Sequence, residues 1–167
     1  MAMNKTNDEI KNVLDRFPLG VGVATLGRGG VESGLTISWM SPVAFDPLHI
    51  MIAVDKLHYS VDFLRSTKNF VLNILKKDQL TLAGNFARPS MTGETKLDKV
   101  ATRESETGAA ILVDALSYFD CEVVQSLEVG DHILFIGKVV DAAVLSPGEP
   151  LTTMAGIHYH KSKPAKR

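Results

Sequence analysis

Cysteine is almost absent from this sequence: Cys121 is the only one among 167 residues. A single cysteine excludes an intrachain disulfide and any metal site built from several thiolates. Because Cys121 lies in an apolar, strand-like run, we expect it to be a buried and inert thiol. The five histidines do not follow the spacing of a metal-binding motif, so the sequence does not support a metal site.

An excess of charge of either sign is also missing, since the formal net charge is −1. This balance gives no electrostatic basis for binding nucleic acid or an anionic membrane. No apolar run approaches the roughly 20 residues of a membrane-spanning helix, and the polar N-terminus has no apolar signal core. We therefore expect a cytoplasmic protein whose partners include neither nucleic acid nor membrane.

Motifs for covalent catalysis and nucleotide phosphate binding are missing too. The sequence has no G-x-S-x-G turn for a nucleophilic serine. The glycines between Gly20 and Gly30 match neither the dinucleotide pattern nor the P-loop, and they indicate a hairpin in a curved sheet. If the protein is an enzyme, an organic cofactor would have to supply the chemistry.

What the chain does contain is enough apolar sequence for one folded domain, since 45% of its residues are hydrophobic. Turn residues separate six or seven strand-like segments, and two or three short helical patterns lie between them. Because strands and long helices do not alternate, the pattern predicts a mainly β, antiparallel barrel or sandwich. The strand candidates are residues 19–26, 31–40, 48–55, 70–75, 110–114, 118–127 and 132–145.

Capping residues and apolar spacing predict three short helices. Asn7 is the predicted N-cap of the first, whose apolar residues between Ile10 and Phe17 share one face that we expect to join the core. Ser60 and Asp78 are the predicted N-caps of the other two. Residues 88–103 contain proline and glycine among polar residues, which indicates a long surface loop.

The stretch from Gly34 to Asp55 combines a polar corner with two apolar strands. Hydroxyls, an indole and a thioether lie close together before Pro42, and such a corner suits a flat ligand with a polar edge. The alternative is a core hairpin with an ordinary polar end, and spacing alone fits that alternative better.

The segment His58-Tyr59-Ser60 precedes the second predicted helix. A capped helix start offers free amides and the positive end of the helix dipole, and His58 adds a donor, so a phosphate could bind here. A simple capped helix explains the same residues equally well, and the sequence leaves both interpretations open.

Several ordered motifs resemble the flavin reductase-like FMN-binding family. They are Gly34-Leu-Thr-Ile-Ser-Trp-Met-Ser-Pro-Val-Ala-Phe-Asp-Pro47, His58-Tyr-Ser60, Phe70-Val-Leu-Asn-Ile-Leu75, Asn85-Phe-Ala87, Gly130-Asp-His-Ile-Leu-Phe-Ile-Gly137 and the Tyr159 region. The resemblance covers residues 14–160, leaves a basic tail at 161–167, and implies one domain over 1–167. It also implies a split β-barrel of antiparallel Greek-key topology with short flanking helices. A homodimer with flavin sites near the subunit interface is the implied assembly.

The resemblance assigns an expected role to each matching position. Residues of the corner would hold the ring edge and the ribityl chain of FMN, with FAD as a possible replacement. The segment after the second strand would hold the phosphate, and the end of the third helix would close over the ligand. His132 would border the nicotinamide side as the catalytic candidate, although without the family it is an ordinary strand-start histidine. The expected cofactor-binding residues are Thr36, Ile37, Ser38, Trp39, Met40, Ser41, His58, Tyr59, Ser60, Asn85, Phe86, Ala87 and Arg88.

Two departures from the family pattern leave the function open between two classes. The family often has arginine where His58 stands, so Arg88 or a loop lysine could compensate. Many reductases of the family carry a small residue where this chain has Trp39, and a tryptophan here is more like the electron-transfer members of the family.

The first class of function is an NAD(P)H-dependent flavin or ferric reductase that passes hydride from the nicotinamide to flavin N5. The alternative is an FMN-binding electron-transfer protein without NAD(P)H activity, reduced by a partner protein. A less favoured third possibility is a pyridoxamine-phosphate-oxidase-like protein.

Overall fold

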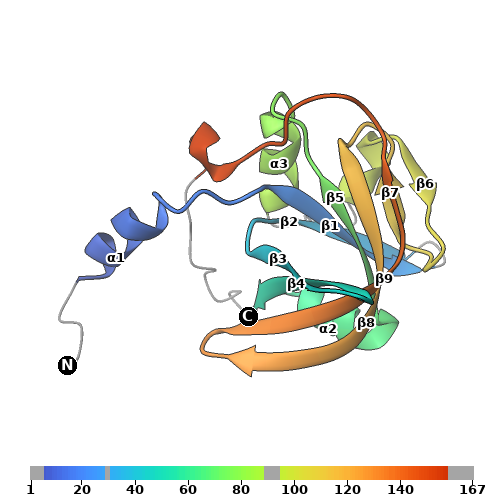
Figure 1. Cartoon of the computed structure of the whole chain (residues 1–167), viewed down its shortest axis with the longest axis horizontal. Coiled ribbons are helices and arrows are strands. Elements are labelled where there is room, and N and C mark those ends of the chain that lie inside the picture. The colour runs from blue at the N-terminus through green and yellow to red at the C-terminus, as the bar shows by residue number, and fades with distance from the viewer. Residues whose placement is uncertain (1–5, 29–30, 89–94, 158–167) are drawn as a thin grey trace.

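The computed structural model describes residues 6–28, 31–88 and 95–157, and nine strands lie in this part of the chain. Seven form one antiparallel sheet, and β6 and β7 form a separate pair (Figure 1). Three α-helices and two short 3₁₀ helices flank the sheets. The strands are β1 (Gly22–Arg28), β2 (Val31–Ile37), β3 (Met40–Phe45), β4 (Leu48–Asp55), β5 (Asn69–Ile74), β6 (Thr102–Glu104), β7 (Ala110–Leu112), β8 (Ser117–Val129) and β9 (His132–Val144). The helices are α1 (Asn7–Leu14), α2 (Ser60–Thr67), α3 (Leu80–Ala87), η1 (Lys96–Lys99) and η2 (Thr153–Ala155).

The large sheet has the order β2-β1-β5-β8-β9-β4-β3, so two consecutive strands, β2 and β3, lie at its opposite edges. Only Ser38 and Trp39 link them along the chain. The sheet therefore curls until its edges approach each other without pairing. At that split the Ala53 amide of β4 donates to the Trp39 carbonyl over 2.8 Å. This arrangement confirms the predicted split, antiparallel barrel.

Both faces of the sheet are buried where the curled layer packs on itself and on the helices. In β1, Ala24 and Leu26 pack in one apolar cluster, whereas Val23, with Val21 just before the strand, packs with α3 and β7. Cys121 of β8 is fully buried in the first cluster, as predicted. Burial raises the pKa of its thiol, which keeps the sulfur protonated and inert.

The first helix differs from its prediction in its N-cap and in its packing. Thr6, not Asn7, is the N-cap, and its side chain exchanges hydrogen bonds with Glu9 in a capping box. The helix ends at Leu14, and α1 projects from the body of the protein (Figure 1). Val13 is 63% exposed and Phe17, beyond the helix, is 61% exposed. The prediction that this apolar face joins the core was therefore wrong.

The predicted caps of the other two helices were also wrong. Tyr59 occupies the N-cap position of α2 and Gln79 that of α3, and neither caps with its side chain. Ser60 is instead the first residue inside α2. Asp78 lies in the turn before α3, where Gln79 accepts the Lys76 amide with its side-chain oxygen.

Two segments that the sequence predicted to be a turn or a loop contain regular secondary structure. Residues 40–45 form β3. This strand lies at the edge of the sheet, where the missing N–H of Pro42 interrupts no hydrogen bond to a further strand. The predicted loop 88–103 includes η1 and the start of β6, and β6 pairs with β7. Residues 89–94, Tyr159 and the tail 161–167 lie outside the described part of the chain. Among the described residues, no helix is both long enough and apolar enough to span a membrane.

Candidate functional site

A cavity of about 270 Å³ lies at the split of the barrel, where the ends of several elements meet. The antiparallel register aligns Asp55, at the end of β4, with His132, at the start of β9. The corner after β2 and the end of α3 complete the wall. The lining residues are Val21, Leu35, Thr36, Ile37, Ser38, Trp39, Ala53, Val54, Asp55, His58, Phe86, Ala87, His132 and Ile157.

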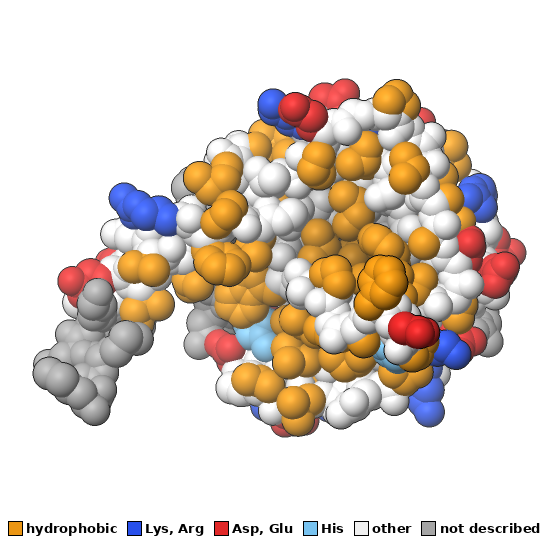
Figure 2. Space-filling view, viewed as in Figure 1, with side chains coloured by type: hydrophobic (Ala, Val, Ile, Leu, Met, Phe, Trp, Pro, Cys, Tyr) orange, Lys and Arg blue, Asp and Glu red, His pale blue; other side chains and the backbone are white. Residues whose placement is uncertain are grey.

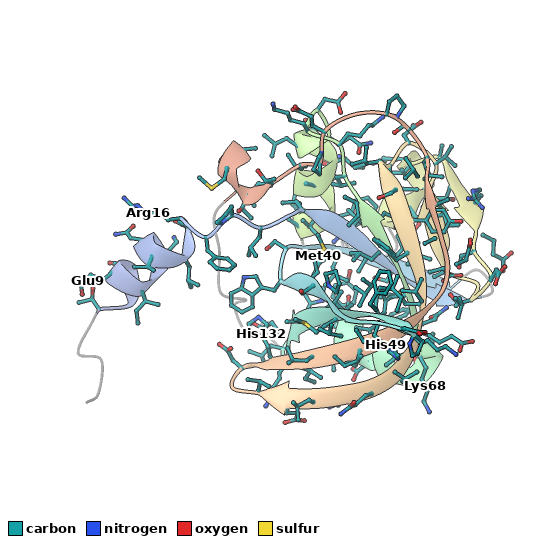
Figure 3. All side chains as sticks on the ribbon, viewed as in Figure 1. Glu9, Arg16, Met40, His49, Lys68 and His132 are labelled. Atoms are coloured by element: carbon teal, nitrogen blue, oxygen red, sulfur yellow. The ribbon has the colours of Figure 1, made fainter. Side chains whose placement is uncertain are left out.

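A second, more apolar cavity of about 560 Å³ adjoins the first. Both cavities are lined by Ser38, Trp39, Ala53 and Ile157, so the indole of Trp39 belongs to the wall between them. Figure 3 places His132 on the side of the molecule from which α1 projects. The remaining lining residues are Leu14, Asp15, Phe17, Leu19, Met40, Ser41, Met51, Leu134 and Thr153.

Among the described residues, the corner has one hydroxyl, that of Ser38, for which the protein provides no acceptor. Thr36 donates its hydroxyl to the Ala83 carbonyl of α3 over 2.6 Å, which fixes the helix against β2. Ser41 donates to the Pro42 carbonyl over 2.9 Å. Ser38 lines both cavities, and its hydroxyl is therefore the corner hydroxyl that can donate to a ligand.

His58 presents a neutral imidazole to the first cavity. Its Nδ1 accepts the Ser60 amide over 3.2 Å, so in the neutral ring the proton lies on Nε2. Burial lowers the pKa of His58, the charge of Lys96 lowers it further, and Asp55 opposes both effects. Near neutral pH the residue is therefore a hydrogen-bond donor rather than a full cation.

The start of α2 does not offer the free amides that the sequence suggested. The Ser60 amide is bonded to His58 Nδ1, and the Val61 and Asp62 amides donate to the His58 and Tyr59 carbonyls over 3.0 and 3.3 Å. The Ser60 hydroxyl is buried without a hydrogen-bond partner and does not line the cavity. The expectation of exposed amides at this helix start was therefore wrong, and side chains must supply any anion binding here.

His132 is held on two sides. Its Nδ1 lies 2.7 Å from the Asp131 carboxylate, and its ring centroid lies 4.6 Å from that of Trp39 at a tilt of 32°. The residue is only 8% exposed but still lines the first cavity. Asp131 and Trp39 therefore fix the direction in which the imidazole faces a ligand.

The structure brings most of the sequence-predicted site residues together. Thr36, Ile37, Ser38, Trp39, His58, Phe86, Ala87 and His132 line the first cavity, and Met40 and Ser41 line the second. The remaining four, Tyr59, Ser60, Asn85 and Arg88, do not line either cavity. Arg88 donates to the Asn85 side-chain oxygen over 2.7 Å, beside the cavity residue Ala87.

Sequence reasoning missed Val54 and Asp55, and it did not single out Lys96 among the lysines of the predicted loop 88–103. Val54 and Asp55 lie at the end of β4, whose apolar sequence predicts a strand buried in the core. The charged pair Asp55-Lys56 was the signal that this end of the strand reaches the surface. Lys96 Nζ donates to the Phe86 carbonyl over 2.8 Å and approaches the Gly34 carbonyl at 3.5 Å. No local pattern indicated Lys96 in particular, because residues 88–103 were predicted to form a surface loop.

The cavity can hold a flat organic molecule by one polar edge. Its lining combines the aromatic rings of Trp39 and Phe86 with the Ser38 hydroxyl, the His58 Nε2–H and backbone groups at the strand ends. Among the described residues, no three His, Cys, Asp or Glu side chains form a possible metal site. The residues present thus fit the shape and polarity of an isoalloxazine ring system.

Comparison with known proteins agrees with this geometry. The family described as flavin reductase like domain matches residues 14–163. The chain belongs to this family. The match confirms the resemblance seen in the sequence and the enzyme class expected from it, a flavin oxidoreductase.

Members of the flavin reductase-like family that resemble this protein fall into two kinds. The reductase component of a 4-nitrophenol 4-monooxygenase/4-nitrocatechol 2-monooxygenase from Rhodococcus opacus is 34% identical, and the match covers 91% of this chain and 80% of the relative. The diflavin flavoprotein A 3 of Nostoc sp. is 32% identical over 96% of this chain, which spans only 27% of that longer protein. The NADH:FAD oxidoreductase of Streptomyces globisporus C-1027 superposes with a TM-score of 0.85 at 26% identity, over 98% of both chains.

Proposed function

We propose that this protein is an NAD(P)H-dependent flavin reductase that binds FMN in the cavity at the split of the barrel. The observation that carries the proposal is the convergence of the Ser38–Trp39 corner, His58, the end of α3 and His132 on one cavity. The relatives named as reductases support the same activity for this chain. FAD is the alternative flavin, and free flavin or a partner protein is the proposed electron acceptor.

Each wall of the cavity has a proposed task. The backbone and side chains of residues 36–41 hold the ring edge and the ribityl chain, with Ser38 as the donating hydroxyl. His58, with Tyr59 and Ser60 behind it, faces the phosphate, and residues 85–88 cover the ligand. When bound, the flavin supplies the redox chemistry by accepting hydride at N5 from the nicotinamide. His132 lines the substrate side, where Asp131 and Trp39 hold its imidazole in one orientation.

Reduction by a nicotinamide nucleotide tests the proposal directly. Anaerobic mixing of the FMN-loaded protein with NADH or NADPH should bleach the visible flavin absorbance, with one nucleotide reacting faster. The measurement is stopped-flow absorbance, with free FMN and nucleotide as the control. A protein that takes up FMN but stays oxidised with both nucleotides is not a reductase.

A second candidate function is an FMN-binding electron-transfer protein that a partner reduces. The observation that favours it is Trp39, whose indole lines both cavities and stacks on His132. The similarity to the diflavin flavoprotein supports this candidate as well. In the stopped-flow experiment a carrier would remain oxidised with both nucleotides and would bleach only with a reduced partner protein.

We also propose a homodimer in which the apolar surface near the site is covered by a second copy. Phe45, at the end of β3, is 91% exposed, and Val43 beside it is 51% exposed. Phe17 lines the second cavity and is also largely exposed. Figure 2 shows hydrophobic side chains spread over much of the face in view. Exposed apolar side chains that gather on one face are typical of protein–protein interaction sites.

Replacing Phe45 with aspartate should weaken this dimer. A charge at a buried position between two copies has no partner and is costly to desolvate, whereas in the monomer the side chain is already in water. Light scattering after size exclusion should show a dimer for the wild type and a shift toward monomer for Phe45→Asp. The control is Val144→Asp, another exposed apolar residue of the sheet, 79% exposed and far along the chain from the site. A wild-type monomer at micromolar concentration would contradict the homodimer.

A further inference from the structure

Most of the lining of the second cavity has no task in the proposed function. The cavity encloses about 560 Å³, and small-molecule sites in proteins enclose about 300–1,000 Å³, so it can hold an organic molecule. It shares Ser38, Trp39, Ala53 and Ile157 with the first cavity. A molecule bound in the second cavity therefore lies beside the proposed flavin site.

The second cavity is unsuited to an anion. Among the described residues that line it there is no lysine, arginine or histidine, and the one charged side chain is the carboxylate of Asp15. Phosphates and carboxylates bind where cationic groups or free amides meet them. A nicotinamide dinucleotide or a carboxylate chelate of iron is therefore a poor occupant of this cavity, and an uncharged ligand is a better one.

The hydroxyl groups of the lining leave few hydrogen bonds for a ligand. Ser41 donates its hydroxyl to the carbonyl of the next residue over 2.9 Å. Thr153 donates to the Phe17 carbonyl over 3.3 Å and accepts the Leu19 amide over 3.1 Å. Apart from the shared Ser38, the hydroxyls of the described lining are thus already bonded. An occupant of this cavity needs few polar groups, because a buried polar group without a partner is costly.

The apolar part of the lining suits a flat ring. Trp39 and Phe17 supply aromatic side chains, and Met40 and Met51 supply thioethers. Aromatic rings favour offset or tilted contacts with one another, and a methionine sulfur near an aromatic ring adds a favourable contact. The second cavity therefore fits an uncharged, apolar and planar molecule.

We propose that the second cavity binds a quinone, which is the electron acceptor of the flavin. A quinone combines a flat apolar ring with two carbonyl oxygens, and it is reduced by two electrons. It takes up two electrons and two protons to become the hydroquinone, and the reduced flavin gives up the same electrons and protons and returns to its oxidised form. The inference rests on the proposed function, because it assumes that the adjoining cavity holds a flavin.

The fluorescence of Trp39 tests the proposal without reference to turnover. Trp39 is the only tryptophan of the chain and lines the second cavity, so its emission reports on an occupant. Menadione, an uncharged naphthoquinone, should quench this emission to saturation, and a naphthoquinone sulfonate should bind at least about tenfold more weakly. N-acetyltryptophanamide is the control for collisional quenching. Equal affinity for the two quinones, or no saturable quenching by menadione, overturns the proposal.

Saturation with FMN separates the second cavity from the first. A quinone in the second cavity stays bound when FMN fills the first, so the Kd of menadione, measured by titration calorimetry, should change less than about threefold. Displacement of menadione by FMN places the quinone in the flavin site and overturns the proposal. A second copy of the chain that fills the cavity would prevent menadione from binding, which overturns it as well.

Leu134→Lys places an ammonium group in the second cavity, because Leu134 lines this cavity and not the first. We expect about tenfold weaker binding of menadione, tighter binding of the sulfonate and unchanged binding of riboflavin. At subsaturating menadione, anaerobic reoxidation of the reduced FMN-loaded protein should slow by the same factor. The matched control is Val140→Lys on the same strand, which is 37% exposed, lines neither cavity and should change neither quinone constant.

Asp15→Asn supplies a test that does not depend on a charge placed among apolar residues. Removing the carboxylate from the lining should tighten binding of the sulfonate by about two- to fivefold and leave menadione unchanged. An unchanged preference between the two quinones in both Leu134→Lys and Asp15→Asn overturns the proposal.

Flavin binding keeps the two possible failures apart. A protein that binds FMN but not menadione contradicts the quinone site and leaves the proposed function intact. A protein that does not bind FMN contradicts the proposed function itself.

Discussion

Replacing Gly34 with alanine is expected to weaken FMN binding by about tenfold or more. A Cβ at this position would lie 2.7 Å from Cε1 and 2.8 Å from Cδ1 of Phe86, which is closer than carbon atoms can approach. Phe86 is 1% exposed, so its ring can yield only by moving toward the cavity that it lines. Overpacking of this kind costs about 1–3 kcal/mol, and here the strain falls on a residue that lines the cavity. The cavity wall must therefore shift.

The measurement combines flavin fluorescence titration with urea unfolding. The double variant Gly34→Ala/Phe86→Leu removes the clashing ring and should recover part of the lost stability, which separates overpacking from other effects of alanine. The matched control is Gly84→Ala in α3, where a Cβ meets nothing within 4 Å. That variant should bind flavin like the wild type and be no less stable. Wild-type FMN affinity in Gly34→Ala would show that Phe86 does not shape the flavin site.

Replacing Trp39 with alanine is expected to increase the rate of flavin reduction by NADH by about tenfold, or to reveal reduction that the wild type lacks. The indole lines both cavities and lies 4.6 Å from the His132 ring. Its removal opens the wall between the two cavities, so a nicotinamide can approach the ring of a flavin bound in the first. A barrier lowered by about 1.4 kcal/mol corresponds to that tenfold change.

Stopped-flow reduction under anaerobic conditions measures the effect, with FMN at saturation so that affinity does not enter. Trp39→Phe keeps an aromatic ring at the wall and should behave more like the wild type than like Trp39→Ala. Thermal unfolding of the flavin-loaded proteins checks that both variants remain folded. An unchanged reduction rate in Trp39→Ala removes the indole as a barrier and leaves the choice between reductase and carrier to other residues.

The strand pattern could be predicted because apolar runs between turn residues report the buried sheet directly. The edge strands of that sheet could not be predicted in the same way. Pro42 suggested a simple corner, whereas β3 tolerates this proline because it is an edge strand. The cap errors have a similar origin, since Ser60 and Asp78 have good capping side chains but the backbone places Tyr59 and Gln79 at the caps.

The site was predictable where it is made of neighbouring residues and not where distant segments meet. The corner from Thr36 to Ser41 carries its own signal of hydroxyls and an aromatic ring. Lys96 reaches the site only because α3 and η1 pack beside β2, a consequence of tertiary packing that no local pattern records. The exposed face of α1 is a further example, since helical spacing identifies an apolar face but not what covers it.

The split barrel leaves two open sheet edges, and foreign strands can add to such edges and start aggregation. On β3, Pro42 has no N–H to donate to an incoming strand, and a register shift between Pro42 and Ala44 interrupts the edge. On β2, Tyr59 and Lys96 already occupy the Gly34 carbonyl. Both open edges of the sheet thus carry features that hinder the addition of a foreign strand.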